Sequence, residues 1–335
     1  MDRDCEKHFL TRESADWFRG LAVIMVVLSH YAEWWGWLDP LKGAEESVQA
    51  ALMKLGVYGV DIFFMLSGYA MVRSMDQERM YFGYVRKRIR RIYIPYLLVM
   101  GMIELLSGGF DSLRDFGRFV SGYDHWYMFV FFLLQLGFIA VYTIFGSSGS
   151  RLAAFAGFTA FISFLLYRRG MQDFWYVSNP AFVIGVAAGE YETLLGRIVD
   201  RAGRPLAMLL AVALLPAVWA GLTEWADMVG LPPEERLWLQ IGAGMIWTLL
   251  ILVLASGCRI KRSFVCFLGK RSYYIYLTHT YIFMRCVNAL DISLPLRFVV
   301  SAVVTVAVSC LLGRMTAGGR RPSPNMPVPP DGVSP

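Results

Sequence analysis

Long apolar runs recur along almost the whole chain and are separated by short polar segments. Most runs are long enough to cross the roughly 30 Å hydrocarbon core of a bilayer as a helix. The pattern predicts ten transmembrane helices, over residues 17–37, 56–73, 92–108, 125–145, 152–167, 178–190, 205–223, 236–257, 272–290 and 296–313. The run over 178–190 is short and contains Asn179 and Pro180, so we expect a broken or tilted helix there.

Composition supports a membrane protein and excludes a soluble one. Hydrophobic residues make up 56% of the 335-residue chain and charged residues 17%, against roughly 25% charged in a soluble domain. The fold class predicted is therefore all-α, a polytopic membrane helical bundle. The net charge is +6, but the basic residues lie in short clusters between apolar runs, so we expect no nucleic-acid partner.

The distribution of lysine and arginine predicts the orientation. With the N-terminus inside, inner segments hold 23 of the 32 basic residues and outer segments hold 8. Cytoplasmic loops carry this excess, so both termini are expected in the cytoplasm. We divide the chain into a cytoplasmic segment over 1–12, a membrane domain over 13–315 and a disordered Pro-rich cytoplasmic tail over 316–335.

Few ionisable residues lie within the predicted spans, and each is a candidate for function. His30 follows Arg19 by eleven positions on the first helix, which places both on one face about 16 Å apart. Glu33 lies one turn beyond His30, where a carboxylate can orient an imidazole. His30 has two interpretations at this point: a functional base, or a side chain that bonds a neighbouring helix.

A second histidine is predicted at the same depth. His279 lies nine residues beyond Lys270, about 14 Å along a helix that enters from the same side as the first. Two buried histidines at one level suggest a single polar chamber. The histidines and cysteines show no metal-ligand spacing, so we expect no metal site.

The second predicted span and the segment after it contain further candidates. The span GVYGVDIFFMLSGYA, residues 56–70, carries Asp61, for which packing against an arginine or a helix end is the simpler interpretation. The following segment, RKRIRRIYIPYL over 86–97, is interpreted as a loop with five bases: Arg86, Lys87, Arg88, Arg90 and Arg91. These bases either anchor the loop at the membrane or bind phosphate groups.

Taken in order along the chain, these segments resemble the acyltransferase family 3 membrane proteins. The resemblance rests on Arg19 and His30, GVYGVDIFFMLSGY, DHWYMFVFFLLQL, RKRIRRIYIPYL and LGKRSYYIYLTHTY, and covers residues 13 to about 313. Members are mostly bacterial proteins of ten helices that transfer short acyl groups from cytoplasmic acyl-CoA to hydroxyl groups. The resemblance implies an integral protein of the bacterial inner (cytoplasmic) membrane.

The resemblance also implies roles for individual residues. Arg19 and His30 match the arginine–histidine pair regarded as essential, and His279 matches a late-helix histidine. Essential arginines are expected among the five bases, in the part that holds Arg90 and Arg91. Asp61, Ser67 and Gly68 match the second-helix motif as supporting residues.

The resulting hypothesis is O-acyl transfer with acyl-CoA as co-substrate, and acetyl-CoA is the expected donor. The catalytic set is His30, Arg19, Glu33 and His279, and the five bases bind CoA. The acceptor is a carbohydrate, a lipid-linked glycan or a small secondary metabolite, and further partners are polysaccharide-biosynthesis proteins or a second copy of the chain. The rival is a transporter or flippase for a polar lipid or glycan, in which the buried histidines relay protons. A sensor or scaffold is a third interpretation.

Overall fold

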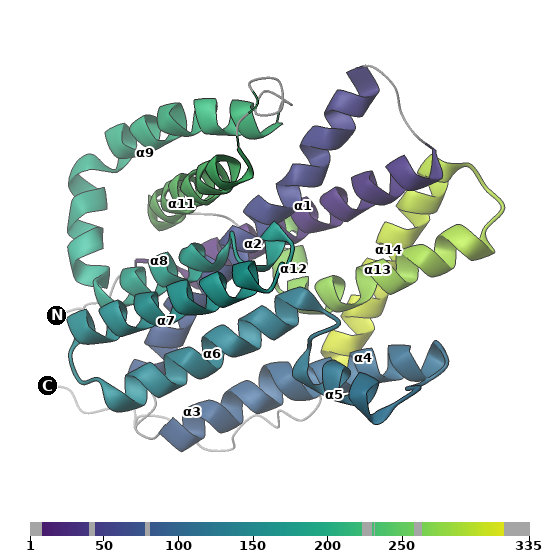
Figure 1. Ribbon diagram of the computed structural model, residues 1–335, viewed down its shortest axis with the longest axis horizontal. Helices are drawn as coiled ribbons and strands as arrows, with labels where there is room; N and C mark the ends of the chain where they lie inside the picture. The colour runs from purple at the N-terminus through teal and green to yellow at the C-terminus, as the bar shows by residue number, and fades with distance from the viewer. Residues whose placement is uncertain are drawn as a thin grey trace, which may run out of the picture.

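The computed structural model describes residues 9–39, 44–77, 81–222, 230, 232–257 and 263–317. Within these residues the chain is all-helical and contains no strand (Figure 1). Six described helices are long and apolar enough to cross a membrane. They are α1 (Arg12–Leu38), α2 (Ala44–Gln77), α6 (Trp126–Ile144), α7 (Ser148–Arg168), α11 (Pro233–Gly257) and α14 (Leu294–Ala317).

The other four predicted spans also coincide with helices, but these do not meet the same criterion of length and apolarity. They are α4 (Ile94–Leu106), α8 (Asn179–Glu190), α9 (Glu192–Leu222) and α13 (Ser272–Ala289). The 12 residues of α8 extend only about 18 Å along the helix axis, in line with the short helix expected at Asn179 and Pro180. The all-helical membrane class is confirmed, whereas the count of ten crossings stays a prediction. The N-terminal segment before Phe9 and the tail over 318–335 lie outside the described residues.

The basic segment is helical, so its interpretation as a loop is wrong. α3 (Tyr81–Arg88) continues through a π-helical turn, η1 (Ile89–Tyr93), into α4. Pro95 has no N–H to donate into the preceding turn, so the regular hydrogen-bond ladder of the helix is interrupted there. The chain widens instead, and the N–H of Ile94 donates to the carbonyl of Ile89, five residues back. The bases are thus held on a continuous helix, which directs them to different sides.

Three shorter elements were not foreseen. These are α5 (Leu113–Ser121), the 3-10 turn η2 (Asp173–Trp175) and α12 (Phe264–Gly269). The hydroxyl of Ser112 caps α5 by accepting from the N–H of Asp115 at 3.1 Å, and Gly122 ends the helix with a φ of 81°. Side-chain capping and a left-handed glycine are common helix boundaries, so this element is recognisable once the loop is searched for caps.

α2 occupies the centre of the bundle. Of the six candidate spans it has the most buried apolar window, 61%, whereas that of α7 is 11% buried. α2 packs along α1 and α8, and glycines allow the close approach. A Cβ at Gly68 would collide with the carbonyl of Phe182 on α8, and one at Gly59 would lie 2.8 Å from the carbonyl of Ala22 on α1. Small residues have this role where membrane helices meet.

Segments predicted to lie on one side of the membrane meet at one end of the bundle. Arg73, near the end of α2, pairs with Glu192 at the start of α9, with 3.1 Å between the charged atoms. The hydroxyl of Ser14, near the start of α1, donates to the carbonyl of Ala255 near the end of α11 at 2.6 Å. The basic clusters therefore share one end of the molecule. That this end faces the cytoplasm stays a prediction, made from the distribution of lysine and arginine.

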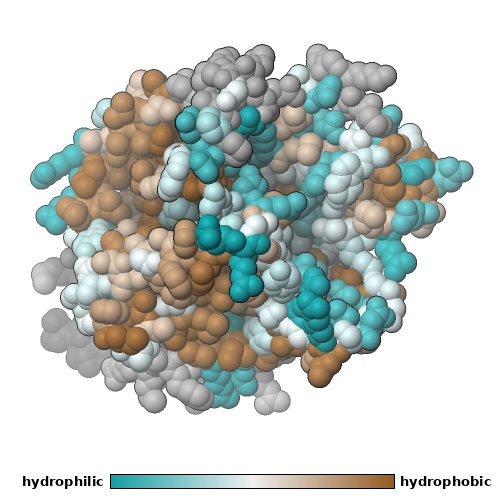
Figure 2. All heavy atoms as spheres, viewed as in Figure 1, coloured by the Kyte–Doolittle hydropathy of each residue, from teal (hydrophilic) through white to brown (hydrophobic). Residues whose placement is uncertain are grey.

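The outer surface of the bundle carries large hydrophobic areas. Figure 2 shows them gathered over α6, α7 and α9 in the view of Figure 1. Exposed side chains on these helices include Leu136, Ile144, Phe161, Phe164, Met208 and Leu209. Contiguous apolar surface of this kind is typical of a lipid-facing protein.

Candidate active site

The two histidines lie side by side. α1 and α13 are in contact, and the ring centroids of His30 and His279 are 5.2 Å apart at an interplanar angle of 37°. His279 is 2% exposed, whereas the side chain of His30 is 34% exposed. The pair thus consists of a sealed imidazole and an accessible one, and His30 is the member that a substrate can reach.

The hydrogen bonds of His279 determine its tautomer. Nδ1 lies 2.7 Å from the carbonyl oxygen of Tyr276 and 3.2 Å from that of Ile275. Carbonyl oxygens only accept, so Nδ1 carries the proton and Nε2 has a free lone pair in the neutral ring. The hydroxyl of Thr280 lies 3.5 Å from that Nε2. His279 is thus an oriented, neutral acceptor beside His30.

Two neighbours on α1 orient His30. Nδ1 of His30 lies 3.6 Å from a carboxylate oxygen of Glu33. This distance is longer than a hydrogen bond, but a small rotation of either side chain brings the two atoms within hydrogen-bond distance. The ring of Trp34 stacks on the imidazole with 5.6 Å between centroids and an interplanar angle of 19°. Trp34 in turn stacks on Phe283 of α13 at 4.4 Å. Nδ1 therefore faces the carboxylate, and Nε2 is the nitrogen left for chemistry.

A polar cavity of about 530 Å³ lies at the end of the bundle where the basic clusters gather. It is bounded by α1, α2, the end of α3 with η1, α6, the end of α12 and α13. Its lining includes four cationic side chains and one carboxylate: Arg19, Arg88, Arg91, Lys270 and Asp16. An excess of positive charge in a cavity is suited to an anionic ligand.

Arg19 forms an ion pair with the carboxylate that also lines this cavity. One of its terminal nitrogens donates to Asp16, one turn earlier on α1, at 3.1 Å. The pairing holds the guanidinium against the cavity wall and leaves other N–H groups for a ligand, since guanidinium has five donors. This is the position at the entrance of α1 that the sequence predicts.

The five predicted phosphate-binding bases divide into two groups. Arg88 and Arg91 line the polar cavity, whereas Arg86, Lys87 and Arg90 line a separate cavity of about 320 Å³ that also includes Arg91. The structure therefore brings two of the five bases to Arg19. Lys270, the C-cap of α12 just before α13, joins them although it was not counted among the predicted ligands.

Two tyrosines separate the cavity from the histidine pair. Tyr127 and Tyr276 both line the cavity, and their ring centroids are 4.7 Å apart. On its far side Tyr276 contacts His279, with 5.9 Å between ring centroids. Tyr276 therefore lies between the cationic cavity and His279, so a ligand that extends from the cations toward the histidines meets this ring.

The second-helix residues have different surroundings. Ser67 lines the polar cavity. Gly68 packs against the backbone of α8. Asp61 is 1% exposed; it interacts with the hydroxyl of Ser178, which is the N-cap of α8, and it lines none of the cavities described here. Asp61 thus lies at a helix end, and packing is the role that its position supports.

Trp34, Lys270 and the tyrosine gate, defined as Tyr127 and Tyr276, are the residues that sequence reasoning missed. Trp34 is four positions beyond His30 and therefore on the same helix face, so this neighbour was open to prediction. The gate joins α6 to α13, and no local pattern reveals such a contact. No cluster of three or more potential metal-ligating side chains occurs among the described residues.

The helices and the site define an integral membrane protein with a cationic cavity and a pair of adjacent histidines, one buried and one accessible. A family model described as an acyltransferase domain matches residues 12–314. The chain therefore belongs to the membrane acyltransferase family 3, and it is an acyltransferase. Searches of curated proteins and of solved structures gave no match.

Proposed function

We propose that this protein is an O-acyltransferase that moves a short acyl group, most simply acetyl, from cytoplasmic acyl-CoA to a hydroxyl group of a cell-surface or exported carbohydrate. The observation that carries the proposal is the spatial order of cations, tyrosines and histidines from one end of the bundle inward. A cavity with four cations and one carboxylate leads to a tyrosine gate, and an oriented histidine pair lies behind the gate.

The cavity suits the nucleotide end of acyl-CoA. The phosphates of CoA are the most highly charged part of the donor, and arginine binds phosphate oxygens through paired N–H groups. Arg19, Arg88 and Arg91 line one cavity, so one ligand can contact all three. The long, uncharged pantetheine arm then carries the thioester inward, past the gate, over the roughly 16 Å between Arg19 and His30.

His30 is the proposed catalytic base. Its Nε2 takes the proton of the acceptor hydroxyl while the hydroxyl oxygen attacks the thioester carbonyl carbon. The C–S bond then breaks, the acyl–oxygen ester forms, and the CoA thiolate receives the proton from His30. Glu33 stabilises the imidazolium that exists between these steps.

A two-step route uses the same residues. Nε2 of His30 attacks the thioester, releases CoA and carries the acyl group, which the acceptor hydroxyl then removes. In both routes the tyrosine gate and the buried His279 keep bulk water from the thioester. Detection of an acylated His30 after reaction with donor alone distinguishes the two routes.

The test uses membranes that contain the protein, labelled acetyl-CoA and the polysaccharide of the host cell. We expect His30→Ala and Arg19→Ala to abolish labelled ester, while the control His125→Gln retains it because His125 packs against Tyr96 away from the cavity. Equal transfer by correctly inserted His30→Ala would overturn the proposal. Substrate movement without consumption of acyl-CoA would favour the transporter.

A further inference from the structure

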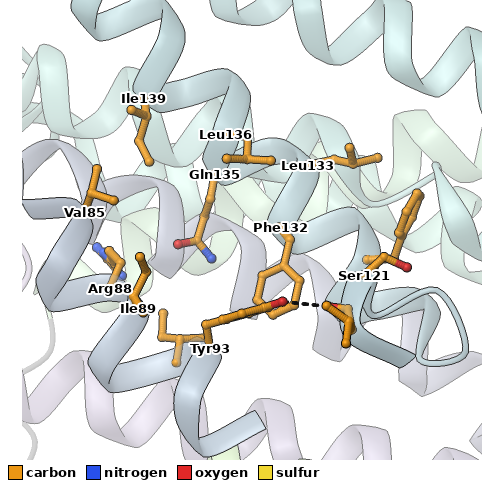
Figure 3. Close-up of a pocket in the computed structure, with 13 residues that line it drawn as sticks. Val85, Arg88, Ile89, Tyr93, Ser121, Phe132, Leu133, Gln135, Leu136 and Ile139 are labelled. Atoms are coloured by element: carbon orange, nitrogen blue, oxygen red, sulfur yellow. Dashed lines mark hydrogen bonds between the residues drawn. The ribbon is translucent and has the colours of Figure 1, made fainter. Parts of the chain in front are cut away.

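A third cavity, here called the α6 crevice, lies on the other side of α3 and η1 from the polar cavity. Its volume is about 410 Å³, and it lies between α3–η1 and α6 with an end at α5. Figure 3 shows its lining, which is mainly apolar. The apolar side chains include Val85, Ile89, Phe129, Phe132, Leu136 and Ile139.

The α6 crevice opens on the outer surface of the bundle. Leu136 is 64% exposed and Ile89 is 44% exposed, although both line it. From Phe129 to Ile139 it follows α6 over ten residue steps, which is about 15 Å and about half of the hydrocarbon thickness. An apolar crevice of this length matches one lipid tail that spans a single leaflet.

The amide of Gln135 points into this apolar crevice and is accessible from it. Gln135 is 7% exposed, and Figure 3 shows its side chain between Arg88 and Ile89 on one side and Phe132 on the other. No hydrogen bond joins its amide to another residue in the part of the chain that the structure describes. An amide without a partner in apolar surroundings is unfavourable, so a polar group of a ligand is the expected partner.

The cation Arg88 lies next to Gln135 in the α6 crevice. Arg88 lines both this crevice and the polar cavity, and its guanidinium lies 5.2 Å from the ring centroid of Tyr84. Arg86, Lys87 and Arg90 lie on the same stretch of helix. Figure 3 shows Gln135 between Arg88 and Phe132, with Ile139 one turn of α6 beyond Gln135 and close to Val85. Charge, amide and apolar wall thus follow each other along the crevice.

We propose that the α6 crevice binds one glycerophospholipid of the surrounding bilayer. The phosphodiester pairs with Arg88, an ester carbonyl accepts from the Gln135 amide, and one acyl tail lies along Phe132, Phe129 and Leu136. The order of anion, ester and hydrocarbon in the lipid matches the order of cation, amide and apolar wall in the crevice. The proposal does not depend on acyl transfer. It has one consequence for that function, because a lipid phosphate on Arg88 competes with the donor for this side chain.

The test is native mass spectrometry of the full chain, purified in mild detergent from membranes of phosphatidylglycerol and phosphatidylethanolamine. We expect the wild-type protein to retain one phospholipid. Leu136→Trp fills the crevice and abolishes retention, and Gln135→Leu lowers it about fivefold through loss of one hydrogen bond. Leu209→Trp is the matched control, because Leu209 is 65% exposed and lies on α9, away from the crevice.

Three outcomes would overturn the proposal. They are equal retention by all four proteins, retention of a CoA thioester in place of phospholipid, and a dimer that Leu136→Trp alone dissociates. Binding of acetyl-CoA to each variant is measured in parallel. Normal acetyl-CoA binding by Leu136→Trp separates a failure of the lipid site from a failure of the proposed function.

Discussion

The imidazoles of His30 and His279, from the first and the penultimate described helices, lie with 5.2 Å between their ring centroids. His279 donates from Nδ1 to the carbonyl of Tyr276, so its Nε2 is a lone-pair acceptor next to the accessible imidazole of His30. This arrangement pairs one imidazole that a substrate can reach with one whose tautomer the backbone determines. The predictions below concern this pair, its neighbours and its cavity.

Replacement of His279 by alanine is expected to lower kcat about 10² to 10⁴-fold, the usual range for a group in proton transfer. The KM for acetyl-CoA should change little, because His279 does not line the cationic cavity. The double variant with His30→Ala should be no slower than His30→Ala alone, since residues that act as a unit are not additive. Losses that multiply would show that His279 acts independently of His30.

The division of the basic segment predicts unequal effects of its arginines. Arg91→Ala should weaken binding of acetyl-CoA about 10- to 100-fold, the effect of losing one charged hydrogen bond. Arg90→Ala is the matched control on the same turn, and it should bind normally because Arg90 lines only the smaller cavity. Isothermal titration with both variants checks this, and equal losses would mean that the whole segment binds the donor.

Trp34 is predicted to be a positioning residue for His30. Trp34→Phe keeps an aromatic face on the imidazole and should retain most activity, whereas Trp34→Ala should lower kcat at least about tenfold with little change in the KM for donor. The control is Trp37→Ala on the same helix, where the side chain is 72% exposed. A kcat for Trp34→Ala like that of the control would remove Trp34 from the site.

Gly68 is predicted to be required for packing. The methyl group of Gly68→Ala would collide with the Phe182 carbonyl and lie 2.9 Å from the N of Val186, so α2 and α8 have to move apart. We expect a loss of about 1–3 kcal/mol in the free energy of unfolding, seen as a lower Tm and a lower yield in membranes. Gly157→Ala on α7 should be neutral, because nothing lies within 4 Å of that position.

The spacing of charged and apolar residues along the sequence determined the fold class, the helix faces and the family of this protein. Length, apolar runs and sparse charge indicated the all-helical membrane class, because uncovered backbone polar groups are too costly in lipid for other open structures. The helical repeat alone placed Arg19 and His30 on one face and predicted the depth of His279. The ordered motifs indicated the family, which the family model confirms over residues 12–314.

The tertiary structure decided which of these residues meet. The resemblance pointed to the part of the basic segment that holds Arg90 and Arg91, but local spacing does not reveal which sides of a continuous helix face a cavity. The packing of this helix against α2 and α6 decides it, and places Arg88 and Arg91 in the polar cavity with Arg19. The tyrosine gate and the contact between α1 and α13 arise from packing of distant segments, and no periodicity within one helix contains that information.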